Sequence, residues 1–429
     1  MKTIAIAGTF DTKGEEYLYI KNLLESLELG TFTIHTGVFE PTFTPDISNR
    51  EVAAAAGVSI DELVAKKDRA LATELLAKGM EKLVPELYKQ GKFDGIISFG
   101  GTGGTSLVTP GMRALPIGVP KVMVSTVASG NTAPYVGTSD IVMMPSVVDV
   151  AGLNSISTKI FTNAAFAIAG MLKFENKQVI EKKPLVATTM FGVTTPCVTA
   201  ARNYLEARGY EVLVFHATGV GGQSMEALIE AGFIEGVLDL TTTEWADEII
   251  GGVLNAGPHR LEAAGKHHIP QVVSVGALDM CNFGPYDTVP EKFAGHKFYK
   301  HNPTVTLMRT TVEENEAIGK KLVEKLNMAK EKTVLMLPLK GISGIDVAGE
   351  AFYGVEEDQM LFDTLRNGVN RNVVEVIEMD CAINDVEFAE AAAQKLIDLM
   401  SNNTNTEHLN NDGGVTHEQK YKNRNHGEV

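Results

Sequence analysis

The sequence has few of the features that mark secreted and membrane proteins. Its 429 residues include only 3 cysteines, Cys197, Cys281 and Cys381, and their wide spacing argues against a disulfide framework or a metal motif. No apolar run reaches the ~18 residues that cross a bilayer, and the start MKTIAIAGTF lacks the small-residue cleavage site of a signal peptide. We therefore expect a cytoplasmic protein with reduced thiols and no membrane partner.

Positive charge is also scarce. The chain has 38 Lys and Arg against 54 Asp and Glu, a net charge of −16, so phosphate backbones are repelled except at a local basic pocket. We therefore expect no nucleic-acid partner. Hydrophobic residues make up 44% and charged residues 21%, which is typical of a globular protein, and the 41 glycines indicate many tight loops.

Short apolar runs alternate with segments of helical period through most of the chain. This alternation predicts an α/β fold with mostly parallel sheets covered by helices on both faces. In the first half, the predicted strands are Thr3–Ala7, Thr31–Val38, Gly95–Phe99, Lys121–Ser125 and Ile141–Met144. The predicted helices are Glu15–Glu28, Ile60–Gln90 and Ile156–Leu172.

The charged segment Lys173–Lys183 separates two apolar regions and predicts a domain boundary. We expect a Rossmann-like, doubly wound subdomain that binds nucleotide or phosphate over residues 1–174, and a second α/β subdomain with a polar cleft over residues 184–400. Residues 401–429 are rich in Asn and poor in apolar side chains, so they cannot bury enough surface to offset their ordering entropy. We predict a disordered tail there.

The two halves also resemble each other. Sliding the sequence along itself at one constant offset aligns Phe10 with Phe191, Asn22 with Asn203 and His35 with His216. Both copies then show a strand, a polar loop, a helix and a second strand in the same order. Duplication of a Rossmann-like unit is the hypothesis, and chance matching over a short window is the alternative.

The stretch SFGGTGGTS, which begins at Ser98, follows an apolar strand and leads into a new element. Glycines let the backbone approach an anion closely, and consecutive N–H groups can line an anion-binding concavity. A tight turn with close helix packing is the alternative. The candidate phosphate-binding residues of this loop are Gly100, Gly101, Thr102, Gly103, Gly104 and Thr105.

Two further loops with small polar residues follow predicted strands, and we expect them to converge on the same pocket. In the first, Lys13 is placed to neutralise a phosphate, and Asp11 either holds Mg²⁺ or caps the following helix. The candidate cofactor-binding residues of these loops are Thr9, Asp11, Thr12, Lys13, Ser129, Gly130 and Asn131.

The second half places ionisable residues where strands should end, and the candidate catalytic residues are His216, Glu244, His301 and Lys340. His216 or His301 suits a general base near neutral pH, and Lys340 suits a carboxylate or phosphate partner. Glu244 is placed to orient the base or ligate Mg²⁺. Any one of these residues has a cap or a surface salt bridge as its alternative role, but together they predict a polar cleft.

Several motifs in a fixed order resemble a bacterial and plant family of largely unassigned function, the family of ATP-binding domains similar to the N-terminal inhibitory domain of tomato's mosaic-virus resistance protein. In the first half these motifs are AGTFDTKGEE, SFGGTGGTSL, PKVMVSTVASGNT and GTSDIVMMPSVVDVAGLN. In the second half they are HATGVGGQSMEALI, DLTTTEWADEIIGG, LDMCNFGP and LPLKGISGID.

The resemblance implies a two-subdomain α/β fold, ATP binding with Mg²⁺, and self-association as a homodimer or higher homo-oligomer. The leading hypothesis is a nucleotide-binding enzyme of small-molecule metabolism that binds nucleotide and a small-molecule ligand in a cleft between its subdomains. Whether the chain is an enzyme stays open. The alternatives are a non-catalytic, ATP-responsive protein-binding module, and a sugar-acid or sugar-phosphate catabolic enzyme whose Gly-rich loops hold substrate without nucleotide.

Overall fold

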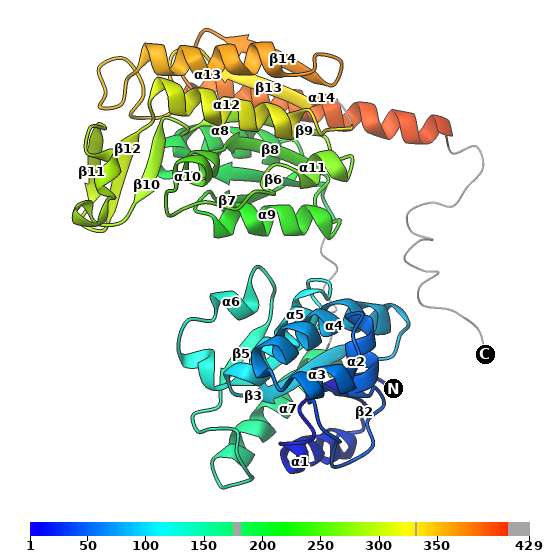
Figure 1. The fold of residues 1–429 in the computed structure, drawn as a ribbon. Helices are drawn as coiled ribbons and strands as arrows, with labels where there is room; N and C mark the ends of the chain where they lie inside the picture. Colours follow the sequence, from blue (N-terminus) through cyan, green and yellow to red (C-terminus); the bar gives the residue numbers. More distant parts are fainter. Residues whose placement is uncertain (175–181, 331–332, 411–429) are drawn as a thin grey trace. The chain divides into compact units, whose positions relative to one another are not determined.

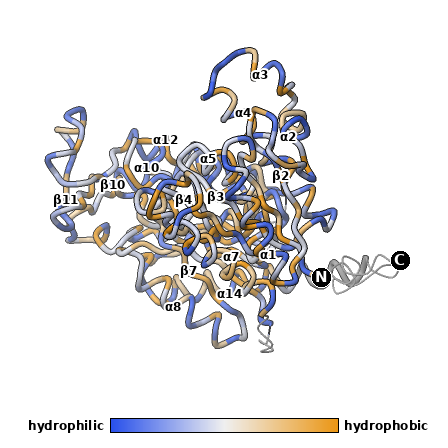
Figure 2. Tube along the Cα trace, turned by 90° about the horizontal axis from the view of Figure 1, so that it is seen from below, coloured by the Kyte–Doolittle hydropathy of each residue, from blue (hydrophilic) through white to orange (hydrophobic). Residues whose placement is uncertain are grey.

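The computed structural model describes residues 1–174, 182–330 and 333–410 and divides into two compact units, Met1–Ile180 and Glu181–Val429 (Figure 1). Each unit has its own sheet and its own hydrophobic core. The sheet strands are apolar, as their colouring in Figure 2 shows for β3 and β4. Among the described helices, none combines the length and the hydropathy needed to cross a membrane.

The N-terminal unit is built on five parallel strands in the order β2-β1-β3-β4-β5. This order confirms the predicted doubly wound sheet, and all five predicted strands are found. Their bounds are β1 (Thr3–Gly8), β2 (Gly30–His35), β3 (Gly95–Gly100), β4 (Lys121–Ser125) and β5 (Val142–Pro145).

Helices cover both faces of this sheet because its strands bury side chains on both sides. One face packs against α1 (Gly14–Ser26) and α7 (Ser157–Lys173). The other face packs against α2 (Asn49–Ala55), α3 (Ile60–Lys66), α4 (Arg69–Lys89) and α5 (Thr102–Arg113). A short helix, α6 (Ala133–Val136), lies between β4 and β5 in the chain.

The prediction of one helix over Ile60–Gln90 was wrong, because the chain breaks between α3 and α4. Lys67 adopts a left-handed conformation with φ 50° and ends α3. Asp68 then starts α4, since its side chain accepts a hydrogen bond from the Leu71 N–H at 3.0 Å. The break turns residues 67–69 toward the ends of the strands.

The C-terminal unit has six parallel strands in the order β14-β13-β9-β8-β6-β7. Their bounds are β6 (Leu185–Met190), β7 (Glu211–His216), β8 (Gly236–Thr241), β9 (Gln271–Gly276), β13 (Thr333–Pro338) and β14 (Val374–Met379). One face packs against α8 (Thr195–Glu206) and α14 (Val386–Asn410). The other packs against α9 (Val220–Glu230), α10 (Glu244–Ile250), α11 (Ala263–Lys266), α12 (Val312–Leu326) and α13 (Val355–Gly368).

Two features of this unit differ from the expectation. A small antiparallel sheet, β10-β12-β11, interrupts the α/β alternation. Its strands are β10 (Met280–Phe283), β11 (Phe298–Asn302) and β12 (Val305–Arg309). Helix α14 also continues to Asn410, into the segment expected to form a disordered tail, and residues 411–429 lie outside the described residues.

The topology supports the duplication hypothesis. Counted from the first strand of each unit, both sheets have the order 2-1-3-4-5, and the C-terminal sheet adds a sixth strand. The constant offset between the halves carries β2 onto β7 at both ends, and it carries the start of α1 at Gly14 onto the start of α8 at Thr195. The alignment made from the sequence is therefore also an alignment of structural elements.

Candidate functional site

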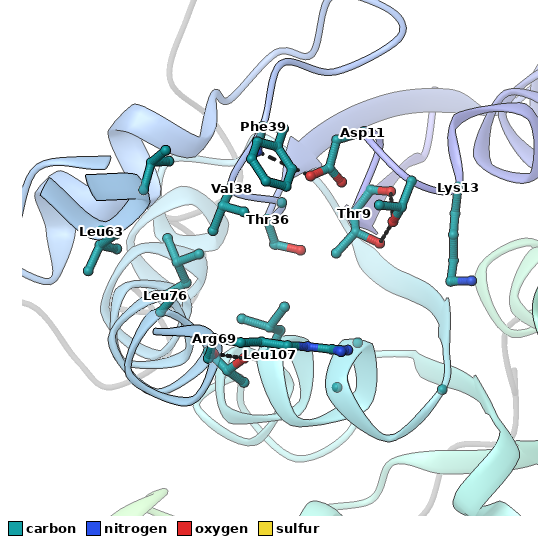
Figure 3. Close-up of a pocket in the computed structure, with 18 of the residues that line it drawn as sticks. Thr9, Asp11, Lys13, Thr36, Val38, Phe39, Leu63, Arg69, Leu76 and Leu107 are labelled. Carbon is teal, nitrogen blue, oxygen red and sulfur yellow. Dashed lines mark hydrogen bonds between the residues drawn. The ribbon is translucent and has the colours of Figure 1, made fainter. Parts of the chain in front are cut away.

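The main candidate site is a cavity of about 970 Å³ in the N-terminal unit (Figure 3). It lies at the carboxyl ends of β1, β2 and β3. In an open α/β sheet of this order, ligands bind at the switch point between the first and third strands, and the loops after β1 and β3 both line the cavity. The break between α3 and α4 forms a further wall of the cavity. The volume falls in the range of small-molecule sites.

One end of the cavity is polar and suited to an anion. Helix α5 begins there, and its N-cap residue Gly101 provides no side-chain cap. The first N–H groups of a helix lack intrahelical partners and carry the positive end of the helix dipole, so they bind anions readily. The polar residues around this end are Thr9, Thr12, Lys13, Arg69, Gly101, Thr102, Gly103 and Gly104.

The fold itself does not require three of the glycines at this end. A Cβ built on Gly101, Gly103 or Gly104 would meet no atom closer than 3.5 Å, and none of the three has a left-handed φ. Gly100 is different, because its Cβ would lie 3.1 Å from the Gly104 Cα. Close approach of a ligand therefore explains Gly101, Gly103 and Gly104 better than internal packing does.

Two cations flank the start of α5. The Arg69 guanidinium lies beside Gly103, whose added Cβ would be 3.5 Å from Nη2, and its side chain has no carboxylate partner among the described residues. Lys13 is the N-cap residue of α1, and its ammonium donates to the Val150 carbonyl. The sequence analysis missed Arg69, because only the helix break brings it to the cavity.

The other end of the cavity is apolar. In Figure 3, Leu63, Val38 and Leu76 lie on the side opposite Lys13. Phe39 is 61% exposed and forms part of the rim. Its loop is held by His35, whose Nδ1 accepts from the Phe10 N–H at 3.1 Å and whose Nε2 donates to the Phe39 carbonyl at 2.9 Å.

Two side-chain oxygens between these ends have no partner. Asp11 accepts the Phe39 N–H on Oδ2 at 3.2 Å, while its Oδ1 is buried and makes no hydrogen bond. The Thr36 side chain is fully buried, and its Oγ1 also lacks a partner. Helix α1 has no side-chain cap, so the alternative role of Asp11 as a helix cap is not found.

Several predicted site residues do not line the cavity. Gly100 ends β3, and Thr105 turns its hydroxyl to the Ser125 hydroxyl at 2.6 Å. Ser129, Gly130 and Asn131 are exposed on the loop after β4. The cavity therefore unites the loops after β1 and β3 as predicted and leaves the loop after β4 outside its wall.

In the C-terminal unit, Glu244 is part of a buried charge network. Its Oε1 accepts the N–H groups of Gly219 and Gly222 at 2.7 and 3.1 Å, and its Oε2 accepts from Arg260 at 2.7 Å. Arg260 also makes a bidentate pair with Asp239, at 2.6 and 2.8 Å. The Gly-rich start of α9 is therefore filled by a carboxylate of the protein.

The other candidate catalytic residues lie on separate elements of this unit. His216 ends β7, His301 is exposed on β11, and Lys340 follows β13 and pairs with exposed Asp380 at 2.9 Å. Three strands lie between β7 and β13, so at ~4.8 Å per strand their ends are roughly 19 Å apart. The structure does not bring His216 and Lys340 together within the unit. A cleft shared by both units stays a prediction.

A second acidic group surrounds Arg309 in the C-terminal unit. Its Nη2 donates to Asp358 at 2.8 Å and lies 3.5 Å from an oxygen of Asp346. Burial, opposed only in part by Arg309, raises the carboxyl pKa of Asp279 to about 7, and burial with the neighbouring carboxylates also raises the pKa of Asp346. One guanidinium cannot balance three negative carboxylates, so we expect these carboxyl groups to retain protons near neutral pH.

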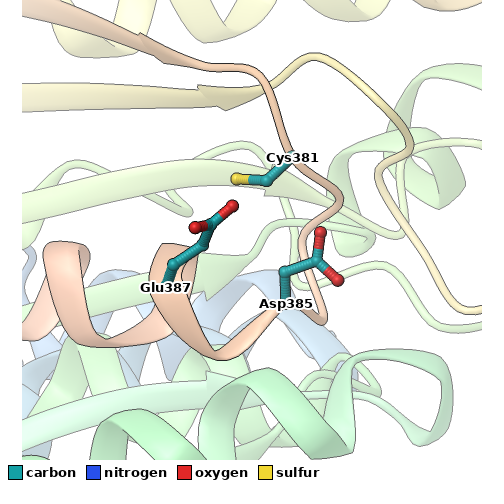
Figure 4. Close-up of side chains that lie close together, drawn as sticks. All are labelled: Cys381, Asp385 and Glu387. Atoms are coloured by element: carbon teal, nitrogen blue, oxygen red, sulfur yellow. The ribbon is translucent and has the colours of Figure 1, made fainter.

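Cys381, Asp385 and Glu387 place ligand atoms within 4.8 Å of one another (Figure 4). Burial and nearby carboxylates raise the pKa of the Cys381 thiol to about 11. Metals bind the thiolate, which is scarce at neutral pH under this pKa, and both carboxylates are exposed. This group is therefore a weaker candidate than the cavity.

Fold and site together define a class: an α/β protein of two doubly wound units whose N-terminal sheet carries an open cavity with one polar end at its switch point. Family models then give the particular family. Residues 2–177 match the N-terminal domain and residues 183–400 the C-terminal domain of the uncharacterised protein family UPF0261. The chain belongs to this family, which confirms the resemblance drawn from the motifs.

Related proteins are similar to this chain over most of its length. A UPF0261 protein of Clostridium tetani is 57% identical over 400 residues, which are 93% of this chain and 99% of that protein. One of Rhizobium meliloti is 45% identical with the same coverage. The tomato ToMV resistance protein Tm-1(GCR237) is 45% identical over 77% of this chain but 45% of its own length.

Comparison with solved structures adds nothing about the site. A complex of S. aureus MnaA with UDP covers 94% of this chain and 97% of that chain, with 10% identity and a TM-score of 0.22. A Streptomyces glycosyltransferase, SsfS6 with thymidine diphosphate, gives a TM-score of 0.18. Such scores carry no argument for a common ligand.

Proposed function

We propose that this protein is a cytoplasmic nucleotide-binding protein and that the cavity of its N-terminal unit holds ATP. The observation that carries the proposal is that one cavity is polar at one end and apolar at the other. An uncapped helix start suits a triphosphate when it is flanked by Lys13 and by Arg69, which has no ion-pair partner among the described residues. The wall of Val38, Leu63 and Leu76 suits a base.

The C-terminal unit supports this location by contrast. Its Gly-rich loop at the start of α9 is already neutralised by Glu244. Among the described residues, no side chain caps the start of α5, although this helix belongs to a unit of the same strand order. Of the two Gly-rich helix starts, only the one in the N-terminal unit is open to a phosphate.

Mg²⁺, which the family resemblance implies, binds through one or two carboxylates together with phosphate oxygens. Asp149 lines the cavity next to Val150, whose carbonyl accepts the Lys13 ammonium, so it lies at the phosphate end. Asp11, the candidate from the sequence, is held beside Phe39 instead. We therefore assign the Mg²⁺ contact to Asp149, where the ion would screen the phosphate charge.

Isothermal titration of the full chain with ATP tests the proposal, and titration with inorganic tripolyphosphate isolates the contribution of the phosphates. We expect saturable binding of ATP at one site per chain and weaker binding of tripolyphosphate, because the latter cannot fill the apolar end. Absence of ATP binding at millimolar concentration, with and without Mg²⁺, would refute the proposal.

ATP is then either a substrate or an effector. Release of ADP or AMP by the full chain, followed by chromatography in the presence of Mg²⁺, distinguishes these roles. The enzyme hypothesis requires turnover with a second small molecule, whereas the binding-module hypothesis requires none.

A further inference from the structure

We infer that Asp11 and Thr36 recognise the ribose of the nucleotide, with Asp11 Oδ1 accepting a hydrogen bond from the vicinal diol. This inference rests on the proposed function and deepens it. It gives the cavity a preference for ribonucleotides. It also gives Asp11 a role other than the metal ligation expected from the sequence.

The first argument is position. In Figure 3, Asp11 and Thr36 lie between the apolar wall of Leu63 and Leu76 and the polar end marked by Lys13. A nucleotide has its base, sugar and phosphates in the same order. With its phosphates at the start of α5 and its base against the apolar wall, its sugar comes to the middle of the cavity.

The second argument is that the fold leaves these two atoms unsatisfied. Among the described residues that line the cavity, Asp11 Oδ1 and Thr36 Oγ1 are the buried side-chain polar atoms without a hydrogen-bond partner. A buried polar atom without a partner costs about 1–3 kcal/mol. A ligand that supplies hydroxyl groups removes this cost, whereas a ligand of apolar surface does not.

The third argument is that both atoms are held in place. Gly8 and His35 are paired across β1 and β2, and the Thr36 N–H donates to the Gly8 carbonyl at 2.9 Å. The other oxygen of Asp11 is fixed by the Phe39 N–H. The two side chains therefore extend from adjacent strand ends, and little conformational entropy is lost when they bind a ligand.

The fourth argument concerns chemistry. An ionised carboxylate only accepts hydrogen bonds, and a threonine hydroxyl both donates and accepts. A vicinal diol offers two donors that also accept, so it matches this pair. The adenine 6-amino group is also a donor, and Mg²⁺ also binds carboxylates, so the experiment must separate these partners from the diol.

The experiment compares ATP with 2′,3′-dideoxy-ATP by isothermal titration of the full chain, with Mg²⁺ and again with EDTA. We expect the wild type to bind ATP about tenfold or more tightly than the dideoxy analogue, as for loss of a charge-assisted hydrogen bond. We expect the same ratio in EDTA. The triphosphate of purine riboside, which lacks the 6-amino group, should bind within about threefold of ATP, since RT ln 3 is small beside such a bond.

Two variants connect the ratio to the named atoms. Asp11→Asn keeps an acceptor for the Phe39 N–H but removes the charge, and Thr36→Val keeps the shape but removes the hydroxyl. Each should reduce the preference for ATP over the dideoxy analogue to about threefold or less, mainly through weaker ATP binding. The matched controls are Asp61→Asn, whose carboxylate pairs with Arg50 at the surface, and Thr109→Val inside α5. Both controls should keep the wild-type ratio.

Equal affinity of the wild type for ATP and the dideoxy analogue overturns the ribose assignment. So does a ratio that disappears in EDTA, which would make Asp11 a metal ligand, or a loss that follows the 6-amino group. These outcomes leave the proposed function intact, because ATP still binds. If neither nucleotide binds and tripolyphosphate also fails, the proposed function is refuted, and the ribose assignment is refuted with it.

Discussion

The ring of Phe191 lies against the ring of His216 with centroids 5.6 Å apart, and at the aligned positions Phe10 lies against His35 at 5.5 Å. In each unit this pair connects the loop after the first strand to the end of the second strand. The interplanar angles differ, 49° against 21°, and His35 is buried whereas His216 is exposed. The pair therefore marks the common plan of the two units, while the surroundings have diverged.

Replacing Gly103 by valine should abolish the ATP-induced rise in melting temperature and leave the apo protein folded. The added side chain enters the space in front of the α5 N-terminus, where its Cβ meets only the Arg69 guanidinium, at 3.5 Å. Differential scanning fluorimetry with and without ATP measures both effects. Gly170→Val in α7 is the matched control, because its Cβ would meet a single Phe174 atom at 4.0 Å. An unchanged ATP shift in Gly103→Val would remove this loop from the site.

Replacing Arg69 by alanine should weaken ATP by about 1.5–3 kcal/mol, the range for hydrogen bonds to charged groups. Because the guanidinium has no partner among the described residues, the apo melting temperature should stay the same. Titration calorimetry gives the affinity, and raising the salt concentration should reduce the difference between wild type and variant. Arg50→Ala, which breaks only a surface pair with Asp61, serves as the control. Wild-type affinity in Arg69→Ala would contradict the assigned phosphate end.

Replacing Arg260 by leucine should destabilise the C-terminal unit by about 3–5 kcal/mol, as removal of one partner from a buried ion pair does. The change leaves Asp239 and Glu244 buried without their cation. Lys340→Ala should leave the free energy of unfolding nearly unchanged, because Lys340 and Asp380 are 58% and 82% exposed. Urea unfolding of both variants checks this contrast. Equal destabilisation would mean that the buried network is not what holds Glu244.

The acidic group around Arg309 predicts a stability that falls as the pH rises. Burial raises the pKa of Asp279 from 3.8 to about 7, so the folded state binds more protons than the unfolded state between these values. This contribution to stability is fully present below about pH 4 and is lost as the pH passes 7. Asp346→Asn removes a second carboxyl group whose pKa burial and neighbouring carboxylates raise, and with it the loss of stability that this group causes as the pH rises.

At pH 8, Asp346→Asn should therefore have a higher free energy of unfolding than the wild type, by on the order of 1 kcal/mol, the value of one pKa unit. The difference should shrink toward pH 5. Denaturant unfolding at several pH values measures it, and Asp61→Asn, at an exposed pair, controls for general charge effects. A difference that grows as the pH falls would show that the sign is wrong.

Much of the fold could be predicted because it depends on local patterns. The strands are apolar runs, and in a parallel sheet buried on both faces such runs are continuous. The helix break at Lys67 and Asp68 could not be predicted, because both residues also fit a helix interior and no Gly or Pro marks the turn. Since Arg69 reaches the cavity only through this break, it was missed with it.

The candidate site could be predicted where its residues directly follow strands. It could not be predicted where the partners of a side chain depend on tertiary packing. Thr9, Lys13 and Gly101–Gly104 line the cavity because they follow adjacent parallel strands, which the sequence shows. The partners of Glu244 depend on Arg260 and on the start of α9, and no spacing in the sequence relates these three elements. The orphan oxygens of Asp11 and Thr36 are likewise visible only once every hydrogen bond has been assigned.

The Glu244 carboxylate at the start of α9 has a consequence for how well each half resists proteolysis. A tethered anion cannot diffuse away, so the C-terminal unit keeps its stabilising charge at any concentration of metabolites. A site that depends on free ligand gains RT ln(1 + [L]/Kd) instead. The N-terminal half should thus be cleaved by proteases faster when nucleotide is depleted, while the C-terminal half resists equally under both conditions.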